Sequence, residues 1–160
     1  MIFLASQLDL KEENPSPESI YETGTVAMIM RMRKLADGRV KILIQGVSKA
    51  KIKEYTQQGD YYSVAVDKIT EPNVSSDLEV EAMMRNAKEM IERIISLGKM
   101  LTPDILLILD DVTDSGRFAD LIASNLGLKV EEAQDILETT DHKERLDKVC
   151  ELLGNELEVL

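Results

Sequence analysis

The spacing of apolar residues changes once along this chain, and that change constrains the fold more than any single motif. Before residue 71, apolar residues alternate with polar ones in short runs bounded by glycine, proline and aspartate, as is typical of strands. After residue 77 they recur every three or four residues, as on one face of a helix. The sequence therefore predicts an α+β protein. A small, mainly antiparallel β-sheet or partial barrel occupies residues 1–72, and an α-helical bundle occupies 77–160.

Four or five strands are predicted in the first half. Residues 24–35 and 39–47 flank Asp37-Gly38, a dipeptide that is typical of tight hairpin turns. A bulge or bend is expected near Gly46, since an isolated glycine in a strand pattern often marks one. The other strands are predicted at residues 1–6, 50–55 and 61–69.

Helix-start signals divide the second half into five helices. Ser76 and Glu79 form a capping-box pattern ahead of a long helix that continues to about residue 101. Thr102-Pro103 predicts the start of a short helix through Leu109, with the threonine as N-cap. The other helices are predicted over 115–126, ending near Gly127, over 130–138, and from Asp141 onward, where Asp141 caps and Glu144 is its capping-box partner.

The last predicted helix carries a heptad seam that continues to the end of the sequence. Its members are Leu146, Cys150, Leu153, Leu157 and Leu160. No glycine, proline or other helix-ending signal follows this seam, and no polar segment precedes the apolar stretch 1–5. We therefore interpret the chain as a fragment of a larger protein. Leu157 and Leu160 lie beyond Gly154, where no other predicted helix reaches. They are therefore predicted to be partly exposed and to contact another copy or a substrate.

Composition excludes several classes of protein. With 44% hydrophobic and 31% charged residues, the chain is predicted to be a soluble globular protein, and no apolar run is long enough to span a membrane. A single cysteine excludes an internal disulfide framework and favours a cytoplasmic location. The net charge of −11 arises wholly after residue 72, and this acidic half would repel a phosphate backbone.

The sequence predicts no catalytic, cofactor or metal site. It contains neither a phosphate-binding loop nor a dinucleotide-binding glycine pattern. His142, the only histidine, is predicted to face solvent in the first turn of a helix, and Cys150 is predicted to be a buried, inert thiol. Asp110, Asp111 and Asp114 form an acidic cluster, which we interpret as helix-ending and helix-capping residues rather than cation ligands.

Two surface patterns in the first half are candidates for partner contacts. One consists of basic residues at odd-numbered positions, which would share a face within each strand: Arg31, Arg33, Arg39, Lys41, Lys49, Lys51 and Lys53. This face is either simply solvated or a docking face for acidic partners, such as the acidic helices of another subunit. The second pattern is Met28, Met30 and Met32 on the opposite face, which either fill the core or bind partners adaptably. Core filling is the preferred interpretation, because Val40, Ile42 and Ile44 lie on a strand that should pair with them.

The segment 116–160 resembles the end of the amino-terminal domain of bacterial Lon proteases. In that family A-D-x-[IV]-A-x-x-L leads into L-K-x-x-x-x-Q-x-[IL]-L-E-T-x-D-x-x-x-R-L. The matching residues here are Ala119, Asp120, Ile122, Ala123, Leu126, Leu128, Lys129, Gln134, Ile136, Leu137, Glu138, Thr139, Asp141, Arg145 and Leu146. Residues 20–29 and 35–52 are similar to the family's Gly-Thr-x-Ala strand and its Asp-Gly hairpin.

The resemblance implies the amino-terminal, substrate-binding domain, truncated at both ends. The family's opening strand and first helix would precede Met1, and its ATPase and serine–lysine peptidase modules would follow Leu160. The whole enzyme would be a cytoplasmic, hexameric, ATP- and Mg-dependent serine protease that degrades misfolded and regulatory proteins. This domain would bind unfolded or degron-bearing substrates and other subunits. It would contain no catalytic residue and no cofactor, and it would bind neither membrane nor nucleic acid. A free-standing protein-binding module of the same fold and an RNA-binding module are the alternative hypotheses.

Overall fold

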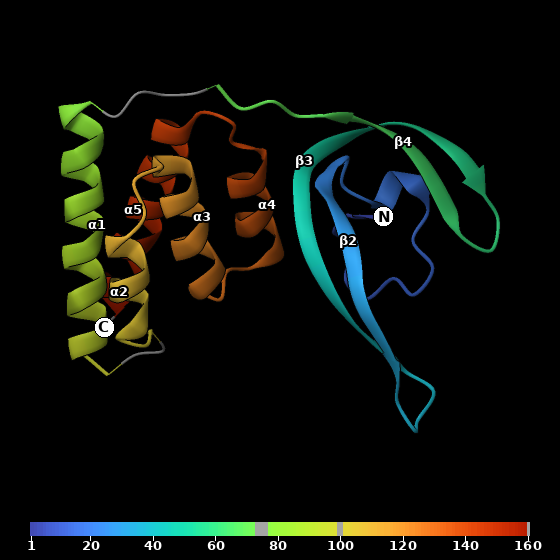
Figure 1. Cartoon of the computed structure of the whole chain (residues 1–160), viewed down its shortest axis with the longest axis horizontal. Coiled ribbons are helices and arrows are strands. Elements are labelled where there is room, and N and C mark those ends of the chain that lie inside the picture. Colours follow the sequence, from blue (N-terminus) through green and yellow to red (C-terminus); the bar gives the residue numbers. More distant parts are fainter. Residues whose placement is uncertain (73–76, 99–100, 160) are drawn as a thin grey trace. The chain divides into compact units, whose positions relative to one another are not determined.

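The chain forms two compact units, Met1–Thr70 and Glu71–Leu160, in a computed structural model that describes residues 1–72, 77–98 and 101–159 (Figure 1). The first unit is a sheet and the second is a helical bundle. The limits predicted from the sequence, 1–72 and 77–160 with a linker in 71–77, remain a proposal.

The sheet unit consists of four antiparallel strands in the order β1-β2-β3-β4. They are β1 (Ile2–Leu4), β2 (Thr23–Lys34), β3 (Val40–Gln58) and β4 (Tyr62–Lys68), with a short 3-10 turn, η1 (Pro17–Ser19), between the first two. The two strands predicted at 39–47 and 50–55 are one continuous strand, because a bulge beside Gly46 bends β3 without interrupting it. The predicted antiparallel sheet is confirmed.

The β2–β3 hairpin closes as its sequence predicts. Gly38 has a φ of +87°, which a side chain would disfavour, and the Asp37 carboxylate accepts the backbone N–H of Arg39 at 3.1 Å. From the pair Ile29–Ile44 to its tip, the hairpin consists of β2 and β3 alone. β1 pairs only with residues 25–27 of β2, and β4 pairs only with residues 50–58 of β3. Its tip extends away from the other strands of the unit (Figure 1).

Two bulges overturn the predicted sharing of faces along this hairpin. Met30 is an additional residue between the pairs Ile29↔Ile44 and Arg31↔Leu43. Directly opposed residues share a face, so Met32 lies with Ile42 and Ile29, while Met28 lies on the other face. The prediction that the three methionines share one face is therefore wrong, since a bulge inverts the alternation.

The basic residues are divided in the same way. Arg31, Arg33 and Lys41 share one face, whereas Lys49 and Lys51 lie on the opposite face, beyond a second bulge at Val47. The predicted sharing of a face holds within residues 24–35, where Arg31 and Arg33 lie on one side, but it does not extend along β3, because the bulge at Val47 lies between Lys41 and Lys49.

The helical unit consists of α1 (Leu78–Ser96), α2 (Asp104–Asp110), α3 (Ser115–Asn125), α4 (Val130–Glu138) and α5 (His142–Val159). Aspartates cap three of these helices. Asp77 accepts the N–H of Val80, Asp114 accepts those of Gly116 and Arg117, and Asp141 accepts that of Glu144. The predicted cap Ser76 lies outside the described residues, and Thr102 precedes the N-cap, Pro103, by one residue. Gly127, with a φ of +62°, follows the end of α3 as predicted.

A continuous apolar core holds the bundle together. Its fully buried members come mainly from α1, α3 and α5 and include Ile91, Phe118, Ile122, Leu146, Val149 and Leu153. In the sheet unit, by contrast, Ala27 and Ala50 are the buried apolar residues. Most large apolar side chains of the sheet therefore remain partly accessible.

Arg145 is fully buried at the joint between α4 and α5 and binds four acceptors. Its Nε donates to the Thr139 carbonyl at 2.8 Å, and its Nη1 donates to Asp120 Oδ2 at 3.3 Å and to the Gly116 carbonyl at 3.5 Å. Its Nη2 donates to the Glu71 carboxylate. The break between α4 and α5 makes this contact possible, because the Thr139 carbonyl at the end of α4 is available to the guanidinium.

His142 belongs to the same cluster, and its predicted solvent-facing position is wrong. The imidazole is only 8% exposed, with Nε2 lying 2.7 Å from Glu71 Oε2 and Nδ1 lying 3.6 Å from Asp114 Oδ1. A Cβ on Gly116 would approach the ring to 2.7 Å. The absence of a side chain at Gly116 allows α3 to approach the imidazole closely, and sequence spacing does not reveal this contact.

We expect Arg145→Met to lower the free energy of unfolding of the helical unit by about 3–5 kcal/mol, because Glu71 and Asp120 would lose the guanidinium that binds both of their carboxylates at a buried position. Urea denaturation followed by circular dichroism measures this loss. Arg85→Met, at an exposed position on α1, is the matched control and should change stability by less than about 0.5 kcal/mol. Equal effects of the two substitutions would contradict the assigned role of the cluster.

Candidate functional site

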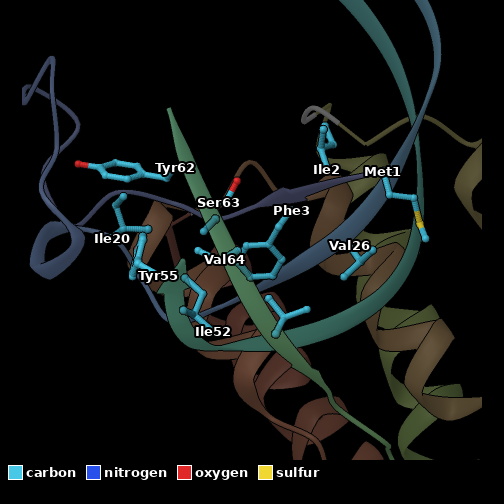
Figure 2. Close-up of a pocket in the computed structure, with 12 residues that line it drawn as sticks. Met1, Ile2, Phe3, Ile20, Val26, Ile52, Tyr55, Tyr62, Ser63 and Val64 are labelled. Atoms are coloured by element: carbon cyan, nitrogen blue, oxygen red, sulfur yellow. The ribbon is translucent and has the colours of Figure 1, made fainter. Parts of the chain in front are cut away.

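The sheet unit contains an open apolar cavity of about 540 Å³ (Figure 2). Phe3, Val64 and Ile52 gather around its centre, Tyr55 and Tyr62 lie at one end, and Met1 and Ile2 lie at the other. The complete lining is Met1, Ile2, Phe3, Ala5, Ile20, Val26, Ile52, Tyr55, Tyr62, Ser63, Val64 and Val66. This lining includes no charged side chain.

Strand register brings these residues to one face. Phe3 lies opposite Val26, Ile52 lies opposite Val66, and Tyr55 lies opposite Val64. A bulge at Lys53 keeps Ile52 and Tyr55 on the same side although they are three residues apart. The cavity is therefore the inner face of a bent sheet.

Gly24 allows β1 to lie close to β2. A Cβ at this position would come within 2.1 Å of the Leu4 carbonyl oxygen and 2.8 Å of the Phe3 ring. Any side chain would displace β1, and with it the Phe3 wall of the cavity.

The two tyrosines form an ordered end wall. Their rings pack edge to face, with centroids 5.4 Å apart, and the Tyr62 hydroxyl donates to the Pro15 carbonyl at 2.8 Å. Burial, and then the nearby Tyr62, Glu18 and Glu22, raise the pKa of Tyr55 above its ordinary value. This shift extends the range of pH over which the Tyr55 hydroxyl is neutral.

The β2–β3 hairpin exposes apolar side chains on both of its faces, and we call Met28, Met30, Met32, Ile42 and Leu43 together the hairpin surface. Met32 and Ile42 lie on one face, whereas Met28 and Leu43 lie on the other. Met30 is 55% exposed and Leu43 is 62% exposed. The preferred prediction, that the three methionines fill the core, is wrong. Along this ribbon no further strand of the sheet unit lies against them.

The other sequence-predicted residues lie on the helical unit. Leu157 is half-buried and packs against the core, and Leu160 lies outside the described residues. Asp111 ends α2 and Asp114 caps α3, which confirms their capping interpretation. Among the described residues, no group of three or more His, Cys, Asp and Glu is arranged to hold a metal ion. None of the described helices is long and apolar enough to cross a membrane.

Comparison with known proteins establishes the family. The family model described as "ATP-dependent protease La (LON) substrate-binding domain" matches residues 1–155. The chain belongs to the Lon substrate-binding domain family. This result confirms the resemblance that the motifs indicate.

Curated Lon proteases match over the whole chain. Lon protease 2 of Bdellovibrio bacteriovorus is 63% identical over 161 residues, which cover 100% of this chain and 20% of that protein. Lon protease 1 of Bacillus subtilis is 39% identical over 160 residues, again 100% of this chain and 20% of the relative. The chain thus spans about a fifth of the length of these relatives.

A solved structure confirms the fold. The N-terminal domain of the Mycobacterium avium complex Lon protease superposes with a TM-score of 0.67 at 18% identity, covering 96% of this chain and 90% of that one. The predicted α+β architecture, a sheet followed by helices, is shared with that domain.

Sequence reasoning missed the cavity of this Lon domain. Its lining comes mainly from four strands, and a bulge at Lys53 places Ile52 and Tyr55 on one face against simple alternation. The clustering of tyrosines at 55, 61 and 62 was the only available signal, and it identifies neither the face nor the partner strand.

We expect Cys150 to react slowly, because burial, together with Asp147, raises the pKa of its thiol to about 11. The shift from 9.0 lowers the thiolate fraction at pH 8 roughly a hundredfold. A chromogenic aromatic disulfide should therefore label the folded chain about a hundredfold more slowly than the chain in urea. The folded rate should still rise with pH up to about 11. Equal rates for folded and unfolded chain would contradict the inert thiol.

Proposed function

We propose that this domain recognises polypeptide substrates for a Lon-type, ATP-dependent serine protease that degrades misfolded and regulatory proteins in the cytoplasm. ATP and Mg would act in other modules of the whole protein, and this domain would contribute binding rather than catalysis. The proposal is carried by the family match over residues 1–155 together with the exposed hairpin surface. The same domain as a free-standing protein-binding module is the alternative.

The hairpin surface has the properties of a site for unfolded proteins. Unfolded chains expose apolar side chains of varied shape, and methionine adapts its shape to such partners. A soluble domain rarely exposes a group of large apolar side chains without a partner. Met30, Met32 and Leu43 are all more than half exposed.

Charge on the hairpin favours acidic segments of substrate. Between residues 28 and 45 the basic residues are Arg31, Arg33, Lys34, Arg39 and Lys41, and Asp37 is the acidic one. Arg33 lies directly opposite Lys41, and like charges in that position repel. A carboxylate bound between them would relieve this repulsion. Residues 28–45 of the hairpin include no aromatic residue for base stacking, so protein is a better partner than RNA.

We expect the triple substitution Met30→Ser, Met32→Ser and Leu43→Ser to weaken binding of an unfolded protein about tenfold or more. Burying one such side chain is worth roughly 1.5–3 kcal/mol, and a tenfold change in affinity corresponds to about 1.4 kcal/mol. Fluorescence anisotropy with labelled, reduced and carboxymethylated α-lactalbumin measures the affinity.

The matched control is Leu78→Ser, because Leu78 is 84% exposed on the helical unit. It should leave the affinity unchanged. Arg31→Gln with Arg33→Gln should reduce the salt dependence of binding. Equal affinity for every variant, or tighter binding of labelled single-stranded RNA than of protein, would contradict the proposal.

We also propose contacts between subunits through Leu157 and Leu160, within a hexamer in the whole protein or a dimer of this chain. Leu157→Gln with Leu160→Gln should then reduce self-association in sedimentation velocity, because both changes remove apolar seam residues. Unchanged association together with a steep fall in melting temperature would show that these leucines serve only the internal core.

A further inference from the structure

We propose that Met28, Met30 and Met32 form an oxidation-sensitive site, at which a peroxide converts their thioethers to sulfoxides and thereby weakens the binding of substrate. We call these three residues the hairpin methionines. The inference rests on the proposed function, because it specifies how binding to the hairpin surface is regulated. All three residues lie beyond the part of β2, residues 25–27, that pairs with β1.

Exposure separates the hairpin methionines from the methionines of the helical unit. The hairpin methionines are between 45% and 59% exposed. Met83, Met84 and Met90 of α1 are half-buried and pack against the apolar core. A thioether is oxidised only where the oxidant reaches its sulfur atom, so the hairpin methionines should be oxidised before those of α1.

The single thiol of the chain does not compete for the oxidant. Thiols are oxidised through their thiolate form, and the fraction of thiolate decides how fast they react. Burial, together with Asp147, raises the pKa of the Cys150 thiol to about 11, so at neutral pH this thiol is almost entirely protonated. The hairpin methionines should therefore be oxidised while Cys150 remains reduced.

The modification transfers one oxygen atom to each sulfur. A lone pair of the sulfur attacks one oxygen of hydrogen peroxide, so that an S–O bond forms and the O–O bond breaks. The sulfur loses two electrons, and the departing hydroxide takes the proton of the transferred hydroxyl and becomes water. In the reverse direction, two thiols reduce the sulfoxide, become a disulfide and release the oxygen as water. The modification is therefore reversible.

The hairpin methionines lie on both faces of the hairpin. Met32 lies beside Ile42 on one face, Met28 lies on the other, and Met30 is the additional residue at a bulge. An apolar segment bound along either face would therefore contact a thioether. A sulfoxide is polar, and covering it with apolar side chains is unfavourable unless its oxygen finds a hydrogen-bond donor. Oxidation should weaken binding on both faces, while the aliphatic side chains of the hairpin keep part of the affinity.

The test measures the affinity for labelled, reduced and carboxymethylated α-lactalbumin before and after treatment of the chain with hydrogen peroxide. Peptide mass spectrometry locates the sulfoxides, and the peroxide is removed before the labelled protein is added. Once the hairpin methionines carry one oxygen each, the chain should bind at least about fivefold more weakly. Methionine sulfoxide reductases A and B, supplied with a thiol, should restore the affinity, because each reduces one epimer of the sulfoxide.

A variant without sulfur on the hairpin assigns the effect to these residues. It combines Met28→Leu, Met30→Leu and Met32→Leu, which keep apolar side chains that peroxide does not oxidise. Its affinity after peroxide should equal its own affinity before peroxide. If this variant lost as much affinity as the parent, the proposal would be overturned, because the other five methionines would then be responsible.

The matched control carries the same three changes on α1: Met83→Leu, Met84→Leu and Met90→Leu. It keeps the hairpin methionines, so peroxide should weaken its binding by the same factor as in the parent. Thermal melting followed by circular dichroism separates lost binding from lost structure. The parent should melt at the same temperature before and after oxidation, because the hairpin methionines lie outside the core. A lower melting temperature after oxidation, absent from the hairpin variant, would assign these methionines to stability and overturn the proposal.

The remaining outcomes distinguish the regulation of the site from the site itself. If the untreated chain binds α-lactalbumin and oxidation of the hairpin methionines leaves the affinity unchanged, only this inference fails. It fails also if the methionines of α1 are oxidised before those of the hairpin. If the untreated chain does not bind α-lactalbumin, the proposed function fails, and this inference fails with it.

Discussion

The buried guanidinium of Arg145 is the interaction on which the helical unit depends. A guanidinium cannot lose its charge inside a protein, so the fold must supply acceptors in a fixed arrangement. Those acceptors come from Glu71, from Gly116 and Asp120 of α3, and from Thr139, which are three separate parts of the chain. One side chain of α5 thus binds the end of α4, the helix α3 and the first residue of the helical unit.

The two units differ in how they use apolar residues. The helical unit buries Ile91, Phe118, Leu146 and many others in one core, and its polar cluster at Arg145 completes that core. The sheet unit buries few side chains and leaves apolar residues around the cavity and on the hairpin surface. This contrast agrees with the proposed binding of polypeptides, because accessible apolar side chains, methionine above all, adapt to partners of different shape.

Local sequence signals predicted much of this fold, and they failed where distant residues meet. The hairpin at Asp37-Gly38 and the caps at Asp114 and Asp141 depend on residues within a few positions, so the sequence contains their full chemistry. The burial of His142 depends on Glu71, seventy-one residues away, and on the absence of a side chain at Gly116. The cavity was likewise inaccessible to sequence reasoning, since its lining requires the registers of four strands. The resemblance to Lon supplied the family but none of these contacts.

The paired bulges of the hairpin have a consequence for how such a chain tolerates insertions and deletions. Val47 is the additional residue on β3 and Met30 is the additional residue on β2, so the one-residue offset begun by the first is cancelled by the second. Only the three residue pairs from Ala27 to Ile29 are shifted. The pairs from Arg31 to Lys34 have the same register as the pairs from Thr23 to Val26. If either residue alone were lost, the one-residue shift in pairing would extend to the end of the hairpin. The turn at Asp37-Gly38 would then no longer fit the register of β2 and β3. Loss of both would restore an uninterrupted ladder, so lineages should gain or lose these two residues together.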